Sequence, residues 1–197
     1  MKIVNYPHPS LRYPAVPVTK IDARLKQFAR EMRDLMFEHR GLGLAAPQVG
    51  IPFQLLVLNL SGDLEKKADD SALLETVFIN PVILDRKGNI DDEEGCLSFP
   101  GLYQKVRRAK NVVVQAYNLN GEALEITASE LPSRAWQHEI DHLHGVLYID
   151  KMGPVGKLAS RAVLKDFERD YHKAQEKGEI PPDEVILKEL AALTATA

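Results

Sequence analysis

Apolar residues recur at helical spacing in three parts of this 197-residue chain. Over 21–40 an apolar residue returns every three or four positions with charged residues between, which predicts an amphipathic helix. A second helix is expected over 157–177. Its residues on or near one apolar face are Leu158, Val163, Leu164, Phe167 and Tyr171. The segment 183–193 predicts one more short helix near the C-terminus.

Short apolar runs bounded by turn residues predict strands in the middle of the chain. The run 53–60 is expected to be a buried strand, and the strand 76–84 is expected to be interrupted or ended at Pro81. Residues 111–128 predict a hairpin, and its Asn120-Gly121 pair is typical of a type I′ turn.

Prolines, glycines and polar runs predict the connections between these elements. Four prolines within residues 1–20 favour an irregular, extended lead-in, because proline also disfavours helix in the preceding residue. The glycines and proline of 41–50 are expected to end regular structure after the first helix. A polar loop is expected over 61–71, and a turn over 87–89.

The expected order of elements favours an α+β fold. Mostly antiparallel strands would surround a central helix over 131–145, with further helices towards the N- and C-termini. At this length we expect a single catalytic domain over 1–178 and a C-terminal tail over 179–197, which holds the short helix.

Composition and charge narrow the class of protein. Hydrophobic residues make up 45% and charged residues 27% of the chain, as in ordinary globular proteins. The net charge of −3 argues against general nucleic-acid binding, which needs a surplus of Lys and Arg. One local basic group is expected to be a solvated strand face: Lys105, Arg107, Arg108 and Lys110.

No segment of the sequence predicts export or membrane insertion. The N-terminus lacks the apolar core of a secretory signal, and no run approaches the roughly 18 apolar residues of a membrane helix. The single Cys96 cannot form an internal disulfide, which fits a reducing compartment. We expect a bacterial cytoplasmic location, with an organellar mature form left open.

The stretch AWQHEIDHLHG at 135–145 holds the most concentrated chemistry. His138 and His142 are four residues apart, so both imidazoles lie on one face of the predicted helix. In the His-Glu-x-x-His pattern two imidazoles hold a divalent metal and the glutamate moves protons. The alternative is an ordinary surface helix rich in His and acid. A catalytic site also needs a third ligand, for which Cys96 is a candidate unless it only packs.

Three sequence blocks occur in order along the chain: GLGLAAPQ at 41–48, EGCLS at 94–98 and QHEIDHLHG at 137–145. Together they resemble the peptide deformylase family. All three in this order make the resemblance specific. The opening HPSLR, the strand FINP and the hairpin NGE extend it over roughly the first 150 residues.

The resemblance implies that Cys96, His138 and His142 bind one divalent metal, with a water as the nucleophile. In this family the physiological metal is ferrous iron, and zinc, nickel or cobalt can replace it. One thiolate and two imidazoles suit all four metals. The implied reaction removes the formyl group from the N-terminal formyl-methionine of newly made polypeptides and releases formate. Glu139 would be the general acid and base.

Further residues receive roles by the same resemblance. The Gln48 side chain and the Leu97 backbone N–H would donate to the formyl oxygen as charge builds on it. The backbone at Gly43 would bind the peptide like an added strand. The pocket for the methionine side chain would be lined by Leu42, Leu131 and Ala135, with the stem of Arg134 nearby. Glu94 and Asp141 would be supporting acids beside the metal ligands.

Two positions depart from the family pattern. The turn before the metal helix, usually Gly followed by small and apolar residues, reads ELPSRAW at 130–136. Tyr103 stands where some members carry an arginine that meets the substrate. Because of these changes, the sequence does not determine the shape of the pocket wall or the preference for particular peptides.

Two other functions remain as alternatives. A zinc peptidase also uses His-Glu-x-x-His, but its third ligand would lie downstream of the helix. A metal-stabilised binding module would keep the ligands without needing Glu139 or Gln48. The expected partners are N-formyl-methionyl nascent peptides, with ribosome association left open and no membrane or direct nucleic-acid recognition expected.

Overall fold

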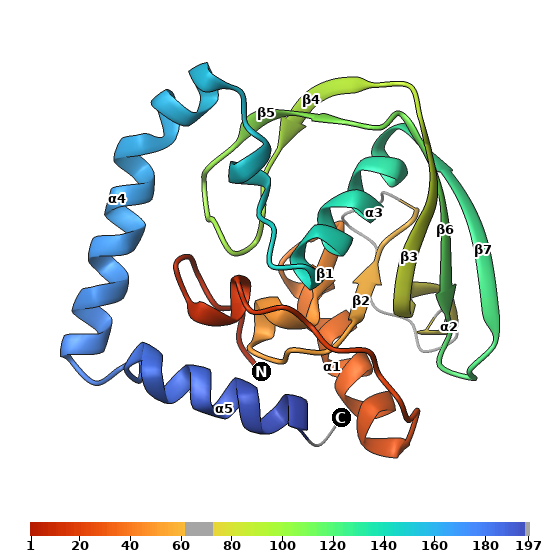
Figure 1. The fold of residues 1–197 in the computed structure, drawn as a ribbon, viewed down its shortest axis with the longest axis horizontal. Helices are drawn as coiled ribbons and strands as arrows, with labels where there is room; N and C mark the ends of the chain where they lie inside the picture. The colour runs from red at the N-terminus through yellow and green to blue at the C-terminus, as the bar shows by residue number, and fades with distance from the viewer. Residues whose placement is uncertain (62–72, 196–197) are drawn as a thin grey trace.

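Figure 1 shows a computed structural model of the chain, which describes residues 1–61 and 73–195. Nearly all of the loop predicted over 61–71 lies outside the described residues. The helices are α1 Ala23–Glu38, α2 Leu73–Thr76, α3 Glu130–Leu143, α4 Pro154–Glu176 and α5 Asp183–Ala195, with 3-10 turns η1 Pro9–Leu11, η2 Ala46–Val49 and η4 Tyr148–Lys151. The strands are β1 Gly43–Ala45, β2 Leu55–Leu58, β3 Val77–Lys87, β4 Ile90–Glu94, β5 Gln104–Arg108, β6 Asn111–Tyr117 and β7 Ala123–Ser129.

The described strands form two antiparallel sheets around α3. One sheet has five strands in the order β1-β2-β3-β6-β7, and the other is the pair β4-β5. Helix α3 contacts every strand of the larger sheet and lies at the centre of the molecule in Figure 1. This architecture confirms the predicted α+β fold with antiparallel strands around a central helix.

One face of α3 is buried against the larger sheet. Trp136, Ile140 and Leu143 recur at helical spacing and join the core that this sheet forms. The Trp136 ring lies 4.5 Å from the ring of Phe78 on β3, centroid to centroid. Burial of this face sets how α3 is rotated about its axis. The adjacent face, which carries His138 and His142, is therefore directed at β4 and the residues that follow β4.

Strand β3 does not end at Pro81 but is interrupted there. Pairing with β6 shifts register between Ile79 and Val82, and Asn80 has a φ of +50°. The Asn80 side chain accepts from Val18 N at 2.8 Å and donates to Val18 O at 2.9 Å. These bonds stabilise a bulge that accommodates proline, so the strand continues to Lys87.

The β6-β7 hairpin is present, but its predicted two-residue type I′ turn is wrong. Tyr117 pairs with Ala123, so the connection is a five-residue loop, 118–122. A type I′ turn needs positive φ at both central residues, and of this pair only Gly121 has it. The Asn118 side chain accepts from the backbone N–H groups of Asn120 and Glu122, which stabilises the longer loop.

Regular structure does not stop in 41–50 as predicted. Residues Gly43–Ala45 form β1, which pairs with β2, and Ala46–Val49 form the turn η2. All three residues of β1 are buried. This short edge strand carries the site residue Gly43 directly past the metal helix.

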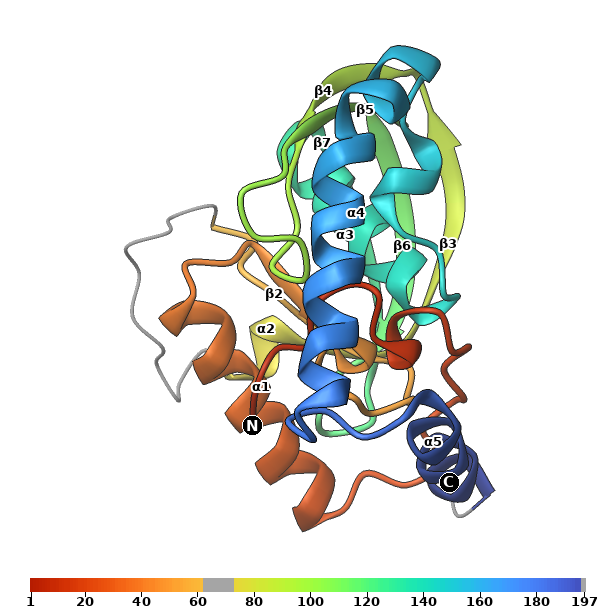
Figure 2. The same cartoon turned by 90° about the vertical axis from the view of Figure 1, so that its left-hand side faces the viewer.

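The two C-terminal helices are confirmed with changed bounds. Helix α4 starts at Pro154, three residues before the prediction, because proline is tolerated in a first turn. Its Leu158 and Val163 are exposed and take no part in the buried face. Figures 1 and 2 show α5 beside the N-terminal segment, where it contacts η1. Among the described residues, no helix has the length and apolarity that crossing a membrane requires.

Glu130, the first residue of α3, has a φ of +56°, where glycine is preferred. We expect Glu130→Gly to raise the free energy of unfolding by about 0.5–1 kcal/mol, because it relieves this backbone strain. Chemical denaturation monitored by circular dichroism measures the change. Glu130→Ala is the control, since it removes the carboxylate that pairs with Lys110 but keeps the strain. An equal gain in both variants would contradict the explanation.

Candidate metal centre

The two histidines of α3 lie on one buried face of the helix. His138 and His142 are one turn apart, and their ring centroids are 5.0 Å apart. Their exposed fractions are 8% and 0%. Burial, together with the charge of neighbouring His138, lowers the pKa of His142 well below its usual value. The lowered pKa favours the neutral imidazole, which is the form that binds a metal.

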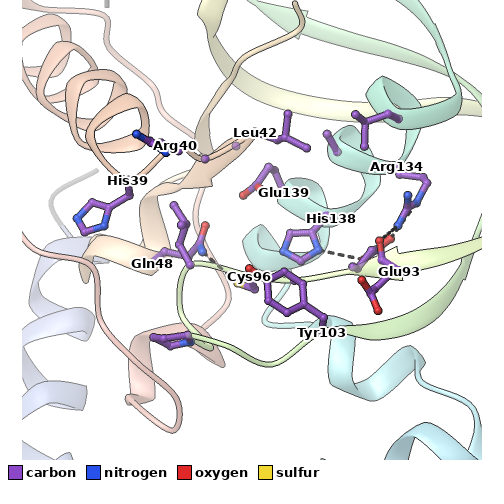
Figure 3. A pocket seen from close by; sticks show the side chains of 18 of the residues that line it. His39, Arg40, Leu42, Gln48, Glu93, Cys96, Tyr103, Arg134, His138 and Glu139 are labelled. Carbon is purple, nitrogen blue, oxygen red and sulfur yellow. Dashed lines mark hydrogen bonds and ion pairs between the residues drawn. The ribbon is translucent and has the colours of Figure 1, made fainter. Parts of the chain in front are cut away.

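Cys96 completes a group of three metal-binding side chains. It lies in the turn after β4, and its Sγ is 3.4 Å from Nε2 of His142. The ligand atoms of Cys96, His138 and His142 all lie within 4.8 Å of one another. Figure 3 shows Cys96 and His138 facing the same space. Residues far apart in the sequence thus converge as the motifs predicted.

A buried ion-pair network holds the first histidine in place. Glu94 Oε2 is 3.1 Å from Nδ1 of His138, and Arg108 donates two bonds to the same carboxylate at 2.9 and 3.0 Å. Because a carboxylate only accepts, Nδ1 of His138 is the donor and its Nε2 is directed to the centre. Burial raises the pKa of Glu94, but the bonds from His138 and Arg108 outweigh it and lower the pKa to about 2.

Arg108 corrects the prediction that the basic group on β5 is a solvated face. Its side chain is 2% exposed and also pairs with Asp141 of α3. The alternation along β5 contained the signal: Val106 and Arg108 share one face and both are buried. Lys105 and Arg107, on the other face, are exposed. Asp141 therefore anchors Arg108, and Arg108 anchors Glu94.

Glu139 lies deep beside the metal-binding group. It is 4% exposed, and its Oε2 has no hydrogen-bond partner among the described residues. Burial, only partly offset by the nearby His138 charge, raises the pKa of Glu139 to about 7. A carboxyl group with this pKa can accept and release a proton near neutral pH.

Gly43 makes room for this carboxylate. A Cβ built on Gly43 would lie 2.5 Å from Oε1 of Glu139, which is closer than any real contact. A side chain at position 43 would clash with Glu139. The family resemblance had suggested a different reason for the glycine, which was close approach of the peptide backbone. Gly41 is restricted in the same way by Leu97 Cδ1, at 2.9 Å.

The Gln48 side chain has a fixed orientation beside Cys96. Ala45 N–H donates to Gln48 Oε1 at 2.8 Å, so the other end of the amide must be its NH₂ group. Gln48 Nε2 then donates to Cys96 Sγ and to Ser98 Oγ, each at 3.3 Å. Ser98 is fully buried and ends the EGCLS block, but the sequence analysis gave it no role.

A cavity of about 400 Å³ opens onto these residues. The predicted peptide-binding residues that line it are Leu42, Gly43, Leu131 and Ala135, and the predicted catalytic residues that line it are Gln48, Leu97 and Glu139. Arg134 lines it too, with its guanidinium paired to Asp92. Of the ligands, Cys96 and His138 line the cavity, whereas the fully buried His142 does not. The structure thus brings every predicted site residue except His142 to one cavity, and His142 lies beside two of the lining residues, Cys96 and His138.

Tyr103 forms part of the rim of this cavity. Its side chain is 60% exposed and lies on Gly95, where an added Cβ would be 2.5 Å from the ring. Gly95 therefore lets an aromatic ring cover the backbone next to Cys96. Tyr103 departs from the family pattern and Gly95 lies in the EGCLS block, but the sequence did not show that the two residues touch.

The donor set fits a divalent metal. The two imidazoles are buried and the Cys96 thiol beside them is partly buried, and the hydrogen bonds that His138 donates to Cys96 and Glu94 outweigh burial and raise the pKa of His138. The acidic groups around His138 therefore favour positive charge at this imidazole. A buried, unpartnered Glu139 oxygen beside them also fits a site built for a polar reactant.

The family model of polypeptide deformylases matches residues 1–157. The peptide deformylase of Rhodopirellula baltica is 38% identical to the chain over 191 residues, which cover 97% of the chain and 92% of that protein. The peptide deformylase of Acidobacterium capsulatum is 48% identical over 164 residues, covering 83% and 93%. This chain belongs to the peptide deformylase family.

Solved structures of peptide deformylases share this fold. The Plasmodium falciparum enzyme superposes with a TM-score of 0.80 at 41% identity, covering 87% of this chain and 98% of that one. Peptide deformylase 1B of Arabidopsis thaliana, in complex with an inhibitor, gives 0.81 at 38% identity, covering 92% and 96%. The chain is therefore a peptide deformylase in fold and enzyme class, and Cys96, His138 and His142 form its candidate metal site.

Proposed function

We propose that the chain removes the formyl group from the N-terminal formyl-methionine of newly made polypeptides and releases formate. The single observation that carries the proposal is the convergence of Cys96, His138 and His142 within 4.8 Å, beside the buried Glu139 carboxyl. Family membership supports the reaction class, and the cavity that opens onto these residues supports a peptide substrate.

We propose one divalent metal held by Cys96, His138 and His142. Ferrous iron is the proposed native metal, and zinc, nickel and cobalt suit the same ligands. When bound, such an ion lowers the pKa of a coordinated water and polarises a carbonyl group. The Glu94 bond to His138 Nδ1 keeps Nε2 directed to the centre.

Glu139 is proposed to move the proton. Its pKa of about 7 allows the carboxylate to accept a proton from the attacking water and return it to the leaving nitrogen. The folded protein positions the Glu139 carboxyl group before substrate binds, because Gly43 leaves the space that the Glu139 side chain fills.

Gln48 and Leu97 are the proposed donors to the formyl oxygen. The Gln48 NH₂ group is fixed by Ala45 at its other end, and it lies beside Cys96. Leu97 lines the cavity one residue after Cys96. Donors held in place before the reaction stabilise developing negative charge more than they stabilise the substrate.

The peptide is proposed to run along β1. Its backbone would pair with the backbone at Gly43, and the methionine side chain would enter the part of the cavity lined by Leu42, Leu131 and Ala135. A bacterial cytoplasmic location agrees with the bacterial relatives, and ribosome association remains a prediction.

The alternatives give different products. A zinc peptidase needs a ligand downstream of α3, whereas the described group takes its third ligand from upstream, at Cys96. A binding module has no use for a buried Glu139. Mass spectrometry of an N-formyl-methionyl peptide after incubation separates them: we expect the intact peptide without its formyl group. Cleaved peptide bonds would indicate a peptidase, and an unchanged peptide a binding module.

We expect Cys96→Ser to weaken metal binding by more than about 100-fold, since loss of a mere supporting partner already costs 10–100-fold. Metal content after dialysis, measured by plasma mass spectrometry, checks this result. His144→Ala is the matched control, because His144 is an exposed histidine at the end of the same helix. Full metal retention by Cys96→Ser would mean that the cysteine only packs.

A further inference from the structure

The opening segment 4–11 lies behind the site, and none of its residues lines the cavity. It holds both loops that carry site residues. Val4 N–H donates to Gln48 O at 2.9 Å, and Tyr6 N–H donates to Ser98 O at 3.0 Å. Ser10 Oγ–H donates to Pro47 O at 2.8 Å. Of these three donors only Ser10 belongs to the HPSLR motif, which the proposed chemistry does not use, and only Ser10 acts through its side chain.

Ser10 is buried, and its hydroxyl lies within 2.8 Å of two partners, the Pro47 carbonyl oxygen and His8 Nδ1. It is 1% exposed, it lies in η1, and His8 Nδ1 is 2.8 Å from its Oγ. Its hydroxyl has one proton, and the Pro47 carbonyl can only accept. Since both partners are buried, neither can exchange this bond for one to water without moving.

Two of these bonds fix the backbone on both sides of Gln48. The Pro47 carbonyl, which also accepts from Gly50 N–H at 3.1 Å, belongs to the peptide plane before the Gln48 Cα, and the Gln48 carbonyl belongs to the plane after it. Because each peptide unit is planar, holding both carbonyls restricts the backbone dihedral angles of Gln48 and so the direction of its Cα–Cβ bond. The bond from Ser10 is the only one of the two that a side-chain substitution can remove.

We propose that Ser10 is a positioning residue for deformylation, which acts by fixing the Gln48 amide through the carbonyl of Pro47. The inference rests on the proposed role of Gln48. A small displacement of a donor that acts on developing charge lowers kcat with little effect on KM. We expect Ser10→Ala to lower kcat roughly tenfold, since misplacement by 1 Å can cost up to about 100-fold. Metal content and KM should remain unchanged.

A double-mutant cycle with Gln48→Ala tests the coupling. Gln48→Ala alone should lower kcat by about 10²–10³-fold, as for loss of one oxyanion donor. If Ser10 acts through Gln48, Ser10→Ala has no further effect in the Gln48→Ala background. Equal losses in both backgrounds, or no loss in either, would overturn the proposal. Turnover by the unsubstituted protein tests the proposed function separately.

A readout independent of activity is the side-chain NH₂ signal of Gln48 in ¹⁵N NMR spectra of the zinc-loaded protein. We expect faster hydrogen exchange of this group in Ser10→Ala, and an unchanged signal would overturn the proposal. Ser10→Cys keeps the volume with a weaker donor and replaces the alanine variant if that variant does not fold. Ser160→Ala is the matched control, a fully buried hydroxyl on α4 whose removal should leave kcat and the Gln48 signal unchanged.

Discussion

Glu139→Gln is expected to lower kcat for deformylation by about 10³–10⁴-fold, at the upper end of the range for a positioned acid–base group. The amide keeps the shape of the carboxyl group but cannot take up the proton. Metal content should stay at the level of the unsubstituted protein, since Glu139 is not one of the three ligands. Formate release under saturating peptide gives kcat, and plasma mass spectrometry gives the metal content.

Glu125→Gln is the control for this substitution. Glu125 lies on β7 with an exposed side chain, away from the cavity lining. Replacing the Glu125 carboxylate with an amide should leave kcat unchanged. A Glu139→Gln variant that keeps full metal and full activity would rule out the proton-transfer role.

Arg108→Ala is expected to lower the free energy of unfolding by about 3–5 kcal/mol, as for removal of one partner from a buried ion pair. Glu94 and Asp141 would lose the guanidinium that both of them contact. Glu94 would keep Arg134 at 3.7 Å and Asp141 would keep Lys151 at 3.2 Å, but neither would keep the buried guanidinium that the two carboxylates share. Urea denaturation of the metal-free protein, followed by tryptophan fluorescence, measures the loss.

The neighbouring Arg107→Ala is the matched control. Arg107 pairs with Asp91, but its side chain is 69% exposed and the pair is screened by solvent. We expect no measurable change in stability. Similar losses for the two substitutions would mean that the buried network does not stabilise the fold.

The sequence predicted the parts of the site that are encoded locally. The spacing of His138 and His142 placed both imidazoles on one face of α3. Its bounds differ from the prediction by only one or two residues. The pairing of Cys96 with α3 came from the family resemblance, because local pattern cannot show contacts between residues 42 or 46 positions apart.

The features that the sequence did not predict depend on contacts between residues far apart in the chain. The bulge in β3 is stabilised by Asn80 bonds to Val18, which lies 62 positions away. Arg108 seemed one of several exposed bases because its partners come from β4 and α3. Helix α5 packs on η1, so the C-terminal part of the chain contacts the N-terminal part. Periodicity within either segment does not encode this contact. The division at residue 178 stays a prediction.

Formate release from an N-formyl-methionyl peptide is the most direct test of the proposed function. The protein would be prepared without oxygen and loaded in parallel with ferrous iron or zinc, and the same peptide with an N-acetyl group would serve as the control substrate. We expect rapid turnover of the formyl peptide, faster with iron, and none of the acetyl peptide. Folded, metal-loaded protein that releases no formate with either metal would contradict the proposed function.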